Sequence, residues 1–467
     1  MNKGAKRFAS EQAWVQGRWA RDVLLEVACD GTWSQVQPGA PLEQRISATP
    51  LRGPVLPGLV NAHSHAFQRA IAGLTERRSV GVQADDDFWS WRDRMYSAAN
   101  RITPEQLEAI ACQLYAELLA GGYTQVCEFH YLHNDGQGAP YANPAEMALA
   151  LVRAAQQTGM GLTLLPTLYM RSGFTATGLR EDQRRFASTP QSIARVVEAV
   201  QRQAEGDPRI NVGIALHSLR AVDPAALCDM AAYARAANLP VHIHIAEQTQ
   251  EVEDCIAHSG QRPIEWLLDH APVDGHWNLV HATHTTSAEL SGVQRSGASI
   301  VICPSTEANL GDGVFDLPGY AAVRGRWSIG SDSHVSRSWI EELRLLEYSQ
   351  RLSRRKRNVA AQVFHHESSA SALFEAALAG GVSATARPVA GIEVGQRADF
   401  ITLDPRSPGL LGIPADHVLD GAVFSSPGVL IESVFVAGVR VGGPCEEIGN
   451  AFAGAMHELW MERPTVR

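Results

Sequence analysis

The sequence predicts an α/β fold, a TIM-type (β/α)8 barrel with a small β-sandwich domain built from both chain termini. Three observations support this prediction. Eight apolar runs follow one another through the middle of the chain, helix-like stretches separate most of them, and both chain ends follow a different pattern. Strands alternating with helices are typical of a parallel sheet, and eight such units can close into a barrel. A length of 467 residues suffices for one large barrel and an accessory unit.

The eight runs are apolar nearly throughout, as expected for parallel strands that are covered on both faces. The intervening stretch Glu105–Ala120 carries the signals of a helix. Thr103 is its predicted N-cap, Pro104 takes the first helical position and Gln106 completes a capping box, while Gly121 follows its end. The predicted strands are Val55–His65, Tyr123–His130, Leu162–Tyr169, Ile210–Ser218, Val241–Glu247, Trp277–His284, Ser299–Thr306 and Trp327–His334.

Both ends of the chain depart from this alternation. Residues 1–56 and 388–467 contain short strand signals separated by Gly and Pro: Leu24–Ala28, Asp399–Leu403 and Ser433–Val441. We expect these two segments to form the halves of one β-sandwich, with a C-terminal tail after the second half. The barrel itself is then expected to span residues 57–387.

The segment Ala66–Arg101 is long for a barrel loop and carries the aromatic sequence Phe88–Arg92. Long loops in compact domains are often lids or binding loops. We therefore interpret this segment as a loop that serves the site.

Composition narrows the classes of partner. Hydrophobic content of 45% with 19% charged residues indicates large buried cores, and no run of about 20 apolar residues predicts a transmembrane helix. No uninterrupted apolar segment follows the first residues, which argues against a signal peptide. A net charge of −10 disfavours nucleic acid and anionic membranes as partners. Seven scattered cysteines without a CxxC pair favour reduced thiols and a cytoplasmic location.

Polar residues stand at the carboxyl ends of four predicted strands, the rim where such barrels place their sites. They are His63 and His65 on the first strand, His244 and Glu247 on the fifth, His281 on the sixth and Asp332 on the eighth. Each motif alone also fits hydrogen-bonded core residues. Together they offer three imidazoles and a carboxylate for a metal, with a carboxylate and an imidazole to spare. A catalytic zinc keeps one position open for water beside acid/base partners, so the set indicates a metal-dependent hydrolase.

On these residues the chain resembles the amidohydrolase superfamily, over essentially its whole length. Some members bridge two metals with a carboxylated strand lysine, but no lysine lies in a predicted barrel strand here. The resemblance therefore implies a single divalent metal ion, with zinc as first choice and iron or manganese as alternatives. Its implied ligands are His63, His65, His244 and Asp332.

The same resemblance leaves Glu247, His281 and Asp332 for catalysis, the pattern of the deaminase-like branch. Glu247 would take up a proton and return it to a leaving amine. His281 would polarise the electrophile or stabilise the tetrahedral oxyanion, and Asp332 would take a proton from the water while remaining a ligand. The implied reaction is attack on an sp² C=N carbon with loss of ammonia. The division of proton transfers among the three groups stays open.

Further segments resemble the formimidoylglutamate deiminases of histidine breakdown: Phe67–Ala70, Trp89–Arg92, Glu128–His133, His217–Arg220 and Cys303–Gly313. This resemblance implies hydrolysis of N-formimidoyl-L-glutamate to N-formyl-L-glutamate and ammonia. Such a substrate carries two carboxylates, which arginine binds bidentately. The residues implied to hold its glutamate portion are Gln68, Arg92, Tyr131, His217 and Arg220.

Alternatives remain open at this point. Arg92 can instead be a surface arginine stacked on Trp89 or Trp91, and Arg220 can form a structural salt bridge. The substrate can be an N-guanidino acid, or a purine, pterin or triazine ring held by aromatic walls. A barrel without catalytic activity is a further alternative, although every predicted ligand is present. We expect a small anionic substrate and, as is ordinary for a barrel of this size, a homodimer.

Overall fold

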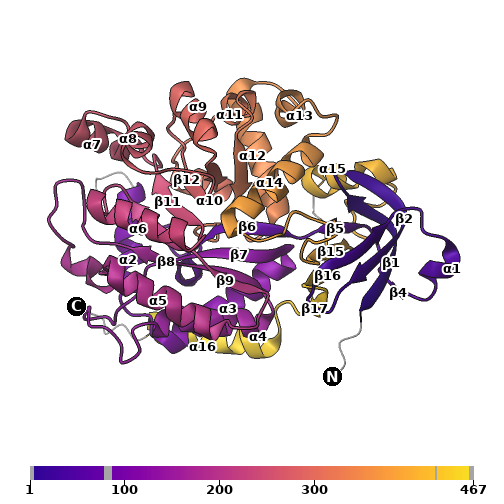
Figure 1. Ribbon diagram of the computed structural model, residues 1–467, viewed down its shortest axis with the longest axis horizontal. Coiled ribbons are helices and arrows are strands. Elements are labelled where there is room, and N and C mark those ends of the chain that lie inside the picture. Colours follow the sequence, from indigo (N-terminus) through magenta and orange to yellow (C-terminus); the bar gives the residue numbers. More distant parts are fainter. Residues whose placement is uncertain (1–4, 78–86, 426–428, 462–467) are drawn as a thin grey trace.

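Two β-sheets, with helices around them, make up the protein. The computed structural model describes residues 5–77, 87–425 and 429–461, and Figure 1 shows the two sheets beside each other. The larger sheet has the parallel order β14-β13-β12-β11-β10-β8-β7-β6, with the short strand β9 (Ile210–Val212) paired to β8. This arrangement confirms the predicted barrel.

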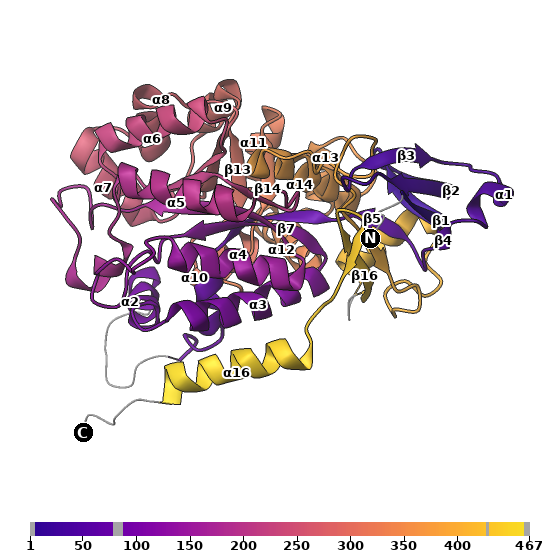
Figure 2. The ribbon, with the colours of Figure 1, turned by 60° about the horizontal axis from the view of Figure 1, so that its bottom comes forward.

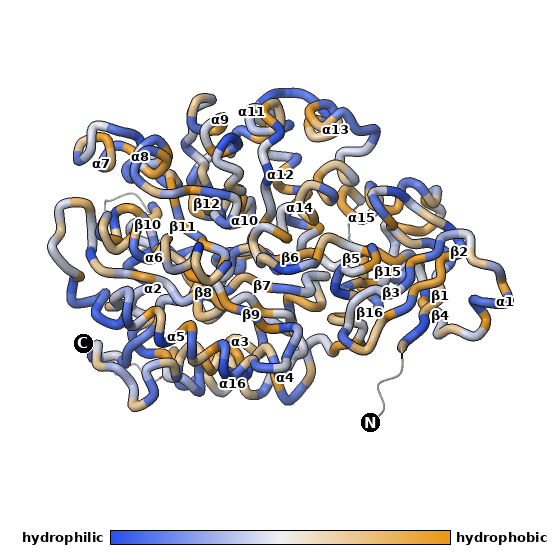
Figure 3. Tube along the Cα trace, in the orientation of Figure 1, coloured by the Kyte–Doolittle hydropathy of each residue, from blue (hydrophilic) through white to orange (hydrophobic). Residues whose placement is uncertain are grey.

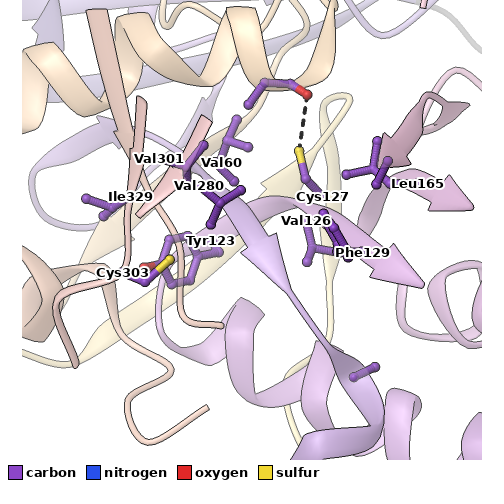
Figure 4. Packing of buried hydrophobic residues seen from close by; sticks show 14 of the residues in the cluster. Val60, Tyr123, Val126, Cys127, Phe129, Leu165, Val280, Val301, Cys303 and Ile329 are labelled. Carbon is purple, nitrogen blue, oxygen red and sulfur yellow. Dashed lines mark hydrogen bonds between the residues drawn. The ribbon is translucent and has the colours of Figure 1, made fainter. Parts of the chain in front are cut away.

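Each of the eight barrel strands overlaps one of the eight apolar runs, but the start of the run Val55–His65 forms β5 (Val55–Pro57) of the second sheet, and the run Ile210–Ser218 contains two strands. The barrel strands are β6 (Leu59–Ser64), β7 (Tyr123–His130), β8 (Gly161–Leu168), β10 (Ile214–Ser218), β11 (Val241–Ile245), β12 (Trp277–His281), β13 (Ser299–Ile302) and β14 (Arg326–Ile329). Every residue of β6, β7 and β8 is buried, which explains why these runs show no polar alternation. Figure 4 shows Val60, Val280, Val301 and Ile329, from four different strands, packed in the core.

The barrel closes between its first strand, β6, and its last, β14. One isolated bridge pairs Ser64 with Asp332 there. The amide of His65 donates to the carbonyl of Asp332 at 3.3 Å, and the amide of Asp332 donates to the carbonyl of His63 at 3.0 Å. The closure thus joins the backbone at three of the predicted metal ligands.

Helices follow the strands along the chain and surround the barrel (Figure 1). They are α3 (Pro104–Ala120), α4 (Glu146–Thr158), α5 (Pro190–Gln203), α6 (Pro224–Ala236), α7 (Thr249–Ser259), α8 (Pro263–His270), α9 (Ser287–Ser296), α10 (Pro304–Leu310), α11 (Leu317–Ala322), α12 (Trp339–Arg354), α13 (Val359–Val363) and α14 (Ser369–Thr385), with the 3₁₀ helix η2 (Glu181–Phe186) before α5. None of the helices in the described ranges combines the length and apolar character needed to cross a bilayer.

The start of α3 confirms the predicted cap. Thr103 Oγ1 accepts from the amide of Gln106 at 3.2 Å, and the Gln106 side chain accepts from the amide of Thr103. We expect Thr103→Ala to lower the free energy of unfolding by about 1 kcal/mol, because one helix amide loses its acceptor. Urea unfolding of both proteins measures this difference, with Ser as the control replacement. Equal stability of the Ala variant would contradict the prediction.

The second sheet contains strands from both chain termini, as predicted. Its order is β17-β16-β15-β5-β1-β2-β3, with β4 beside β1. Phe8, Phe400 and Phe435 pack together in its core, the last two rings stacked with centroids 4.2 Å apart. The strands are β1 (Lys6–Val15), β2 (Arg18–Val27), β3 (Trp33–Gln37), β4 (Thr49–Pro50), β5 (Val55–Pro57), β15 (Phe400–Leu403), β16 (Ile431–Val436) and β17 (Val439–Val441), and the short helices beside them are α1 (Leu42–Arg45), η3 (Ala415–His417) and α15 (Val418–Phe424). Figure 3 shows hydrophobic residues along β15 and along β8 of the barrel, with less hydrophobic positions between them. The exact limits of the two domains stay a prediction.

The segment after β6 contains more regular structure than a loop. It begins with the 3₁₀ helix η1 (Ala66–Ala70) and ends with helix α2 (Phe88–Ala99), while residues 78–86 lie outside the described ranges. Asp87 caps α2 by accepting from the amides of Trp89 and Ser90 at 3.0 Å. An N-cap and helical packing therefore outweigh the β preference of the aromatic residues.

The C-terminal residues form a long helix, α16 (Glu446–Met461), that the sequence analysis does not predict. Figure 2 shows α16 running along the outside of the barrel, beside α3. The indole of Trp460 donates to the carbonyl of Ala70 at 3.1 Å, and the Arg101 guanidinium donates to the carbonyl of Leu459 at 2.7 Å. The end of the chain is thereby attached to η1 and to the segment after α2.

Candidate metal and catalytic centre

The six residues singled out at the strand ends lie together at one rim of the barrel. His63 belongs to β6 and His65 follows it directly, His244 lies on β11, and His281 ends β12. Glu247 and Asp332 lie just beyond the ends of β11 and β14. All six are at least nine-tenths buried. The structure therefore brings together side chains that are up to 269 residues apart, as His63 and Asp332 are.

The four predicted ligands converge on a common point. The Nε2 atoms of His63 and His244 are 3.0 Å apart. Oδ1 of Asp332 lies 3.4 Å from Nε2 of His63 and 3.4 Å from Nε2 of His65. Two ligand atoms of a tetrahedral zinc site are about 3.4 Å apart, given Zn–N distances near 2.1 Å. The three measured pairs are close to this spacing. The ligand atoms of His63, His65 and His244 all lie within 4.8 Å of one another, and so do those of His63, His281 and Asp332.

Hydrogen bonds on the far side of two rings fix their tautomers. Nδ1 of His65 donates to the carbonyl of Phe129 at 2.8 Å, and Nδ1 of His244 donates to the carbonyl of His217 at 3.0 Å. Because the proton is on Nδ1, each Nε2 carries a lone pair that faces the common point. Metal-bound histidines usually make this kind of second hydrogen bond. The donor set therefore fits a divalent metal ion.

Burial favours the neutral, metal-binding form of the imidazoles. It lowers the pKa of His63 to about 3, and it lowers the pKa of His65 as well. Burial alone would raise the pKa of Asp332, but its hydrogen bond to His63 and the surrounding imidazoles hold that pKa well below the usual range. The centre is ready to bind a cation at neutral pH because its ligands are already deprotonated.

Glu247 and His281 lie beside the ligand cluster and add a carboxyl group and an imidazole that can exchange protons. Nε2 of His281 is 3.7 Å from Oε1 of Glu247 and 3.8 Å from Oδ2 of Asp332. Burial raises the pKa of Glu247 to about 7. A carboxyl group with a pKa near neutrality can both take up and release a proton at working pH.

His281 is oriented by a residue that the sequence analysis did not single out, Glu307 of α10. Burial would lower the pKa of His281, but Glu247, Glu307 and Asp332 raise it to about 10. Oε1 of Glu307 lies 3.3 Å from Nδ1 of His281 and accepts from the amide of Cys303 at 2.8 Å. Nothing in the local sequence assigns this contact, since it depends on how α10 folds back over the rim.

The backbone at two of these residues is strained. His281 has a φ of 69° and Asp332 a φ of 46°, in the left-handed region that non-glycine residues rarely adopt. Such residues cost about 1–3 kcal/mol each and cluster at functional sites. The strain is consistent with a rim shaped for chemistry.

All five residues predicted to hold the substrate line one pocket with the catalytic candidates. Gln68, Arg92, Tyr131, His217 and Arg220 share this pocket with His244, Glu247, His281 and Asp332. Its outer wall is made by residues of α2, among them Phe88, Trp91, Met95 and Tyr96. The segment after β6 therefore lines the pocket as a helix and not as the predicted loop.

The two arginines of this pocket are available to an anionic ligand. No carboxylate among the described residues lies within 4.0 Å of Arg220, whose Nε donates to Ser218 Oγ at 3.4 Å. Arg92 reaches only the exposed Asp93, at 4.0 Å, and its guanidinium lies over the Trp89 ring at 4.5 Å. The stacking considered for Arg92 is thus present, but with only 14% of the side chain exposed. Two largely buried cations without a close counter-ion favour binding of carboxylates.

A larger cavity, of about 710 Å³, lies at the opposite end of the barrel. Its lining includes Ile210 and Pro240, at the amino ends of strands, together with Asp207 and Arg387. No histidine is among its lining residues. Because sites of such barrels lie at the carboxyl ends of the strands, the smaller rim pocket is the better candidate.

Comparison with known proteins identifies close relatives. The sequence matches the amidohydrolase family over residues 55–441. It is 45% identical to formimidoylglutamate deiminase from Pseudomonas aeruginosa over 457 residues, which cover 96% of this chain and 98% of the relative.

Solved structures of other proteins share the fold of this chain. An amidohydrolase from Brucella melitensis superposes with a TM-score of 0.90 at 44% identity, covering 97% of this chain and 99% of that one. An adenosine deaminase from Xanthomonas campestris with bound zinc superposes with a TM-score of 0.77 at 22% identity, covering 97% of each chain. At that identity the second likeness concerns the fold alone.

Proposed function

Because the chain belongs to the amidohydrolase family, we propose that it hydrolyses N-formimidoyl-L-glutamate to N-formyl-L-glutamate and ammonia, a reaction of histidine degradation. The observation that carries this proposal is the rim pocket, in which two largely buried arginines face the cluster of histidines and carboxylates. The relative that is 45% identical bears the name of this activity, which supports the same substrate.

The proposed ligands of the metal are His63, His65, His244 and Asp332, with zinc as the first choice of ion. A divalent ion held there would supply an activated water as the nucleophile. Glu247 is proposed to accept a proton from that water and to return it to the departing nitrogen. His281, held by Glu307, polarises the C=N bond and stabilises the negative charge that develops during attack.

The glutamate portion of the substrate is proposed to lie along the arginine side of the pocket. Arg220 and Arg92 would each pair with a carboxylate, for which their planar guanidinium groups are suited. Gln68, Tyr131 and His217 would supply the remaining polar contacts. In this pose the formimino carbon points to Glu247 and His281, so the reacting group and the anionic tail are fixed at once.

One assay tests the function. Ammonia release is measured with N-formimidoylglutamate, N-guanidinoglutarate, guanine and adenosine, alongside elemental analysis of the purified protein. We expect N-formimidoylglutamate to be the best substrate and about one metal ion per chain. Preference for the guanidino acid would change the substrate within the same site, whereas preference for a ring would contradict the role of the arginines.

The pH dependence of the reaction follows from the raised pKa of Glu247. Protonation removes the general base, so kcat/KM should fall as the pH drops through the pKa of Glu247 and should be constant above it. A bound cation favours the carboxylate, which puts this acid limb at or below about pH 7. Initial rates between pH 4.5 and pH 9 measure it, and activity that rises on acidification would contradict the assignment.

We also propose that the protein works as a homodimer in the cytoplasm. Symmetric dimers are the commonest assemblies of soluble enzymes, and the dianionic substrate is an intracellular type of metabolite. Light scattering of the purified protein tests the assembly, with a mass of one chain, 50.5 kDa, as the contrary result.

A further inference from the structure

A cluster of buried polar side chains occupies the closure between β6 and β14. Asn61, Ser64, Ser331 and His334 are each 0% exposed. Their roles are not explained by the proposed reaction, since none of them lines the rim pocket. Buried polar groups are costly unless they are hydrogen-bonded, so their partners reveal what they are for.

The hydrogen bonds of this cluster cross the closure in both directions. The Asn61 amide nitrogen donates to Ser331 Oγ at 2.7 Å, and the Ser331 amide donates back to Asn61 Oδ1 at 2.9 Å. Nε2 of His334 lies 3.1 Å from the carbonyl of His65. A carbonyl can only accept, so this Nε2 carries the proton. Nδ1 of His334 then accepts from the Ser331 hydroxyl at 3.0 Å.

The cluster contacts residues that are proposed metal ligands or stand next to them in the chain. Ser331 precedes Asp332 in the chain, and the carbonyl that His334 reaches belongs to His65 itself. From the other side, Glu128 of β7 accepts from Ser64 Oγ at 2.7 Å and from the amide of Ala66 at 2.5 Å. Those two residues flank His65.

We propose that His334, together with Asn61 and Ser331, is a positioning unit that sets the relative placement of His65 and Asp332 across the closure before the metal binds. The proposal rests on the metal centre of the proposed function. The barrel lacks a continuous strand ladder at this point, where a single bridge joins the described strands. Side chains therefore supplement the two backbone hydrogen bonds that join His63 and His65 to Asp332 across the closure. Because His334 does not line the pocket and its polar contacts are with Ser64, Ser331 and the carbonyl of His65, it acts through the ligands that it positions.

The substitution His334→Asn is designed to remove the hydrogen bond to the carbonyl of His65 and to keep the one from Ser331. Asn tolerates the φ of 64° found at this position. Its shorter side chain keeps an acceptor for Ser331 but does not reach the carbonyl of His65. Loss of an outer-shell partner typically weakens metal binding by about 10–100-fold, and we expect a zinc Kd larger by this factor.

His242→Asn is the matched control. His242 is also 0% exposed, and its Nε2 contacts a carbonyl, that of Ala384, at 2.9 Å. It lies on the strand of His244 but makes no contact with the closure. Its removal should lower stability while leaving the zinc Kd within about threefold of that of the parent.

The experiment uses the full chain after removal of metal with a chelator. Zinc affinity is measured by competition with a chromophoric chelator, without substrate, and thermal unfolding of the metal-free proteins is recorded in parallel. The proposal predicts a larger zinc Kd for His334→Asn and an unchanged zinc Kd for His242→Asn. An unchanged Kd for His334→Asn, or equal weakening in both variants, overturns it.

If His334→Asn does not fold, Ser331→Ala is measured against the same criteria. Failure of the proposed substrate leaves this experiment intact, because no substrate is present. Failure of the parent to bind any divalent ion would instead reject the metal centre itself.

Discussion

Replacing Glu247 with Gln is expected to abolish most of the turnover while leaving the metal bound. The amide has the shape of the carboxyl group but cannot accept and return a proton, and general acid–base groups typically contribute 10²–10⁴-fold, so kcat should fall by about that factor. Glu247 is not among the four proposed ligands, so the metal content should remain that of the parent.

The measurement combines ammonia release under saturating substrate with elemental analysis. Glu251→Gln is the matched control, since Glu251 is equally buried and its Oε2 accepts from the amide of Glu247 at 3.2 Å. This control should retain much more activity than Glu247→Gln. Parent-like turnover of Glu247→Gln would remove Glu247 from the mechanism.

Replacing Arg220 with Ala is expected to reduce kcat/KM for N-formimidoylglutamate by a factor equivalent to about 2–5 kcal/mol. The substrate carboxylate would then be buried without its partner, because no lysine is among the residues that line the pocket. Arg220→Lys should recover only part of the loss, since an ammonium group cannot bind a carboxylate bidentately.

Steady-state kinetics measure this effect, and Arg184→Ala is the control. Arg184 donates to the carbonyl of Gly136 at 2.9 Å and is not part of the pocket lining. Its loss should leave kcat/KM essentially unchanged. Normal kinetics of Arg220→Ala would show that the pocket is built for something other than the dicarboxylate.

Sequence patterns predict the barrel well because its strands are buried on both faces. Such strands appear as uninterrupted apolar runs, and the polar residues that remain stand at their carboxyl ends. Helix α2 was harder to predict, because Phe88, Trp89 and Trp91 are strand-favouring residues and the capping by Asp87 is a weaker signal. Helix α16 follows a region of strand signals, and its contacts with α3 are made across more than 300 residues of sequence.

The candidate site also contains some residues that the sequence predicts and others that it does not. Ligands and acid/base groups could be predicted because metal chemistry restricts residue types and their placement on strand ends. Partners such as Glu307 and His334 could not, since their function depends on which buried atoms they meet. A glutamate on a short helix or a histidine after a strand carries no local sign of that contact.

The mixed order of the second sheet has a consequence for how the chain matures. Its central pair joins β5, near the start of the sequence, to β15, near the end. On the ribosome, β1, β2 and β5 therefore emerge long before the neighbour that covers the open edge of β5. An uncovered strand edge invites pairing with other chains. The nascent protein thus exposes this edge for as long as the entire barrel is being translated, which is when it is most prone to pairing with other chains.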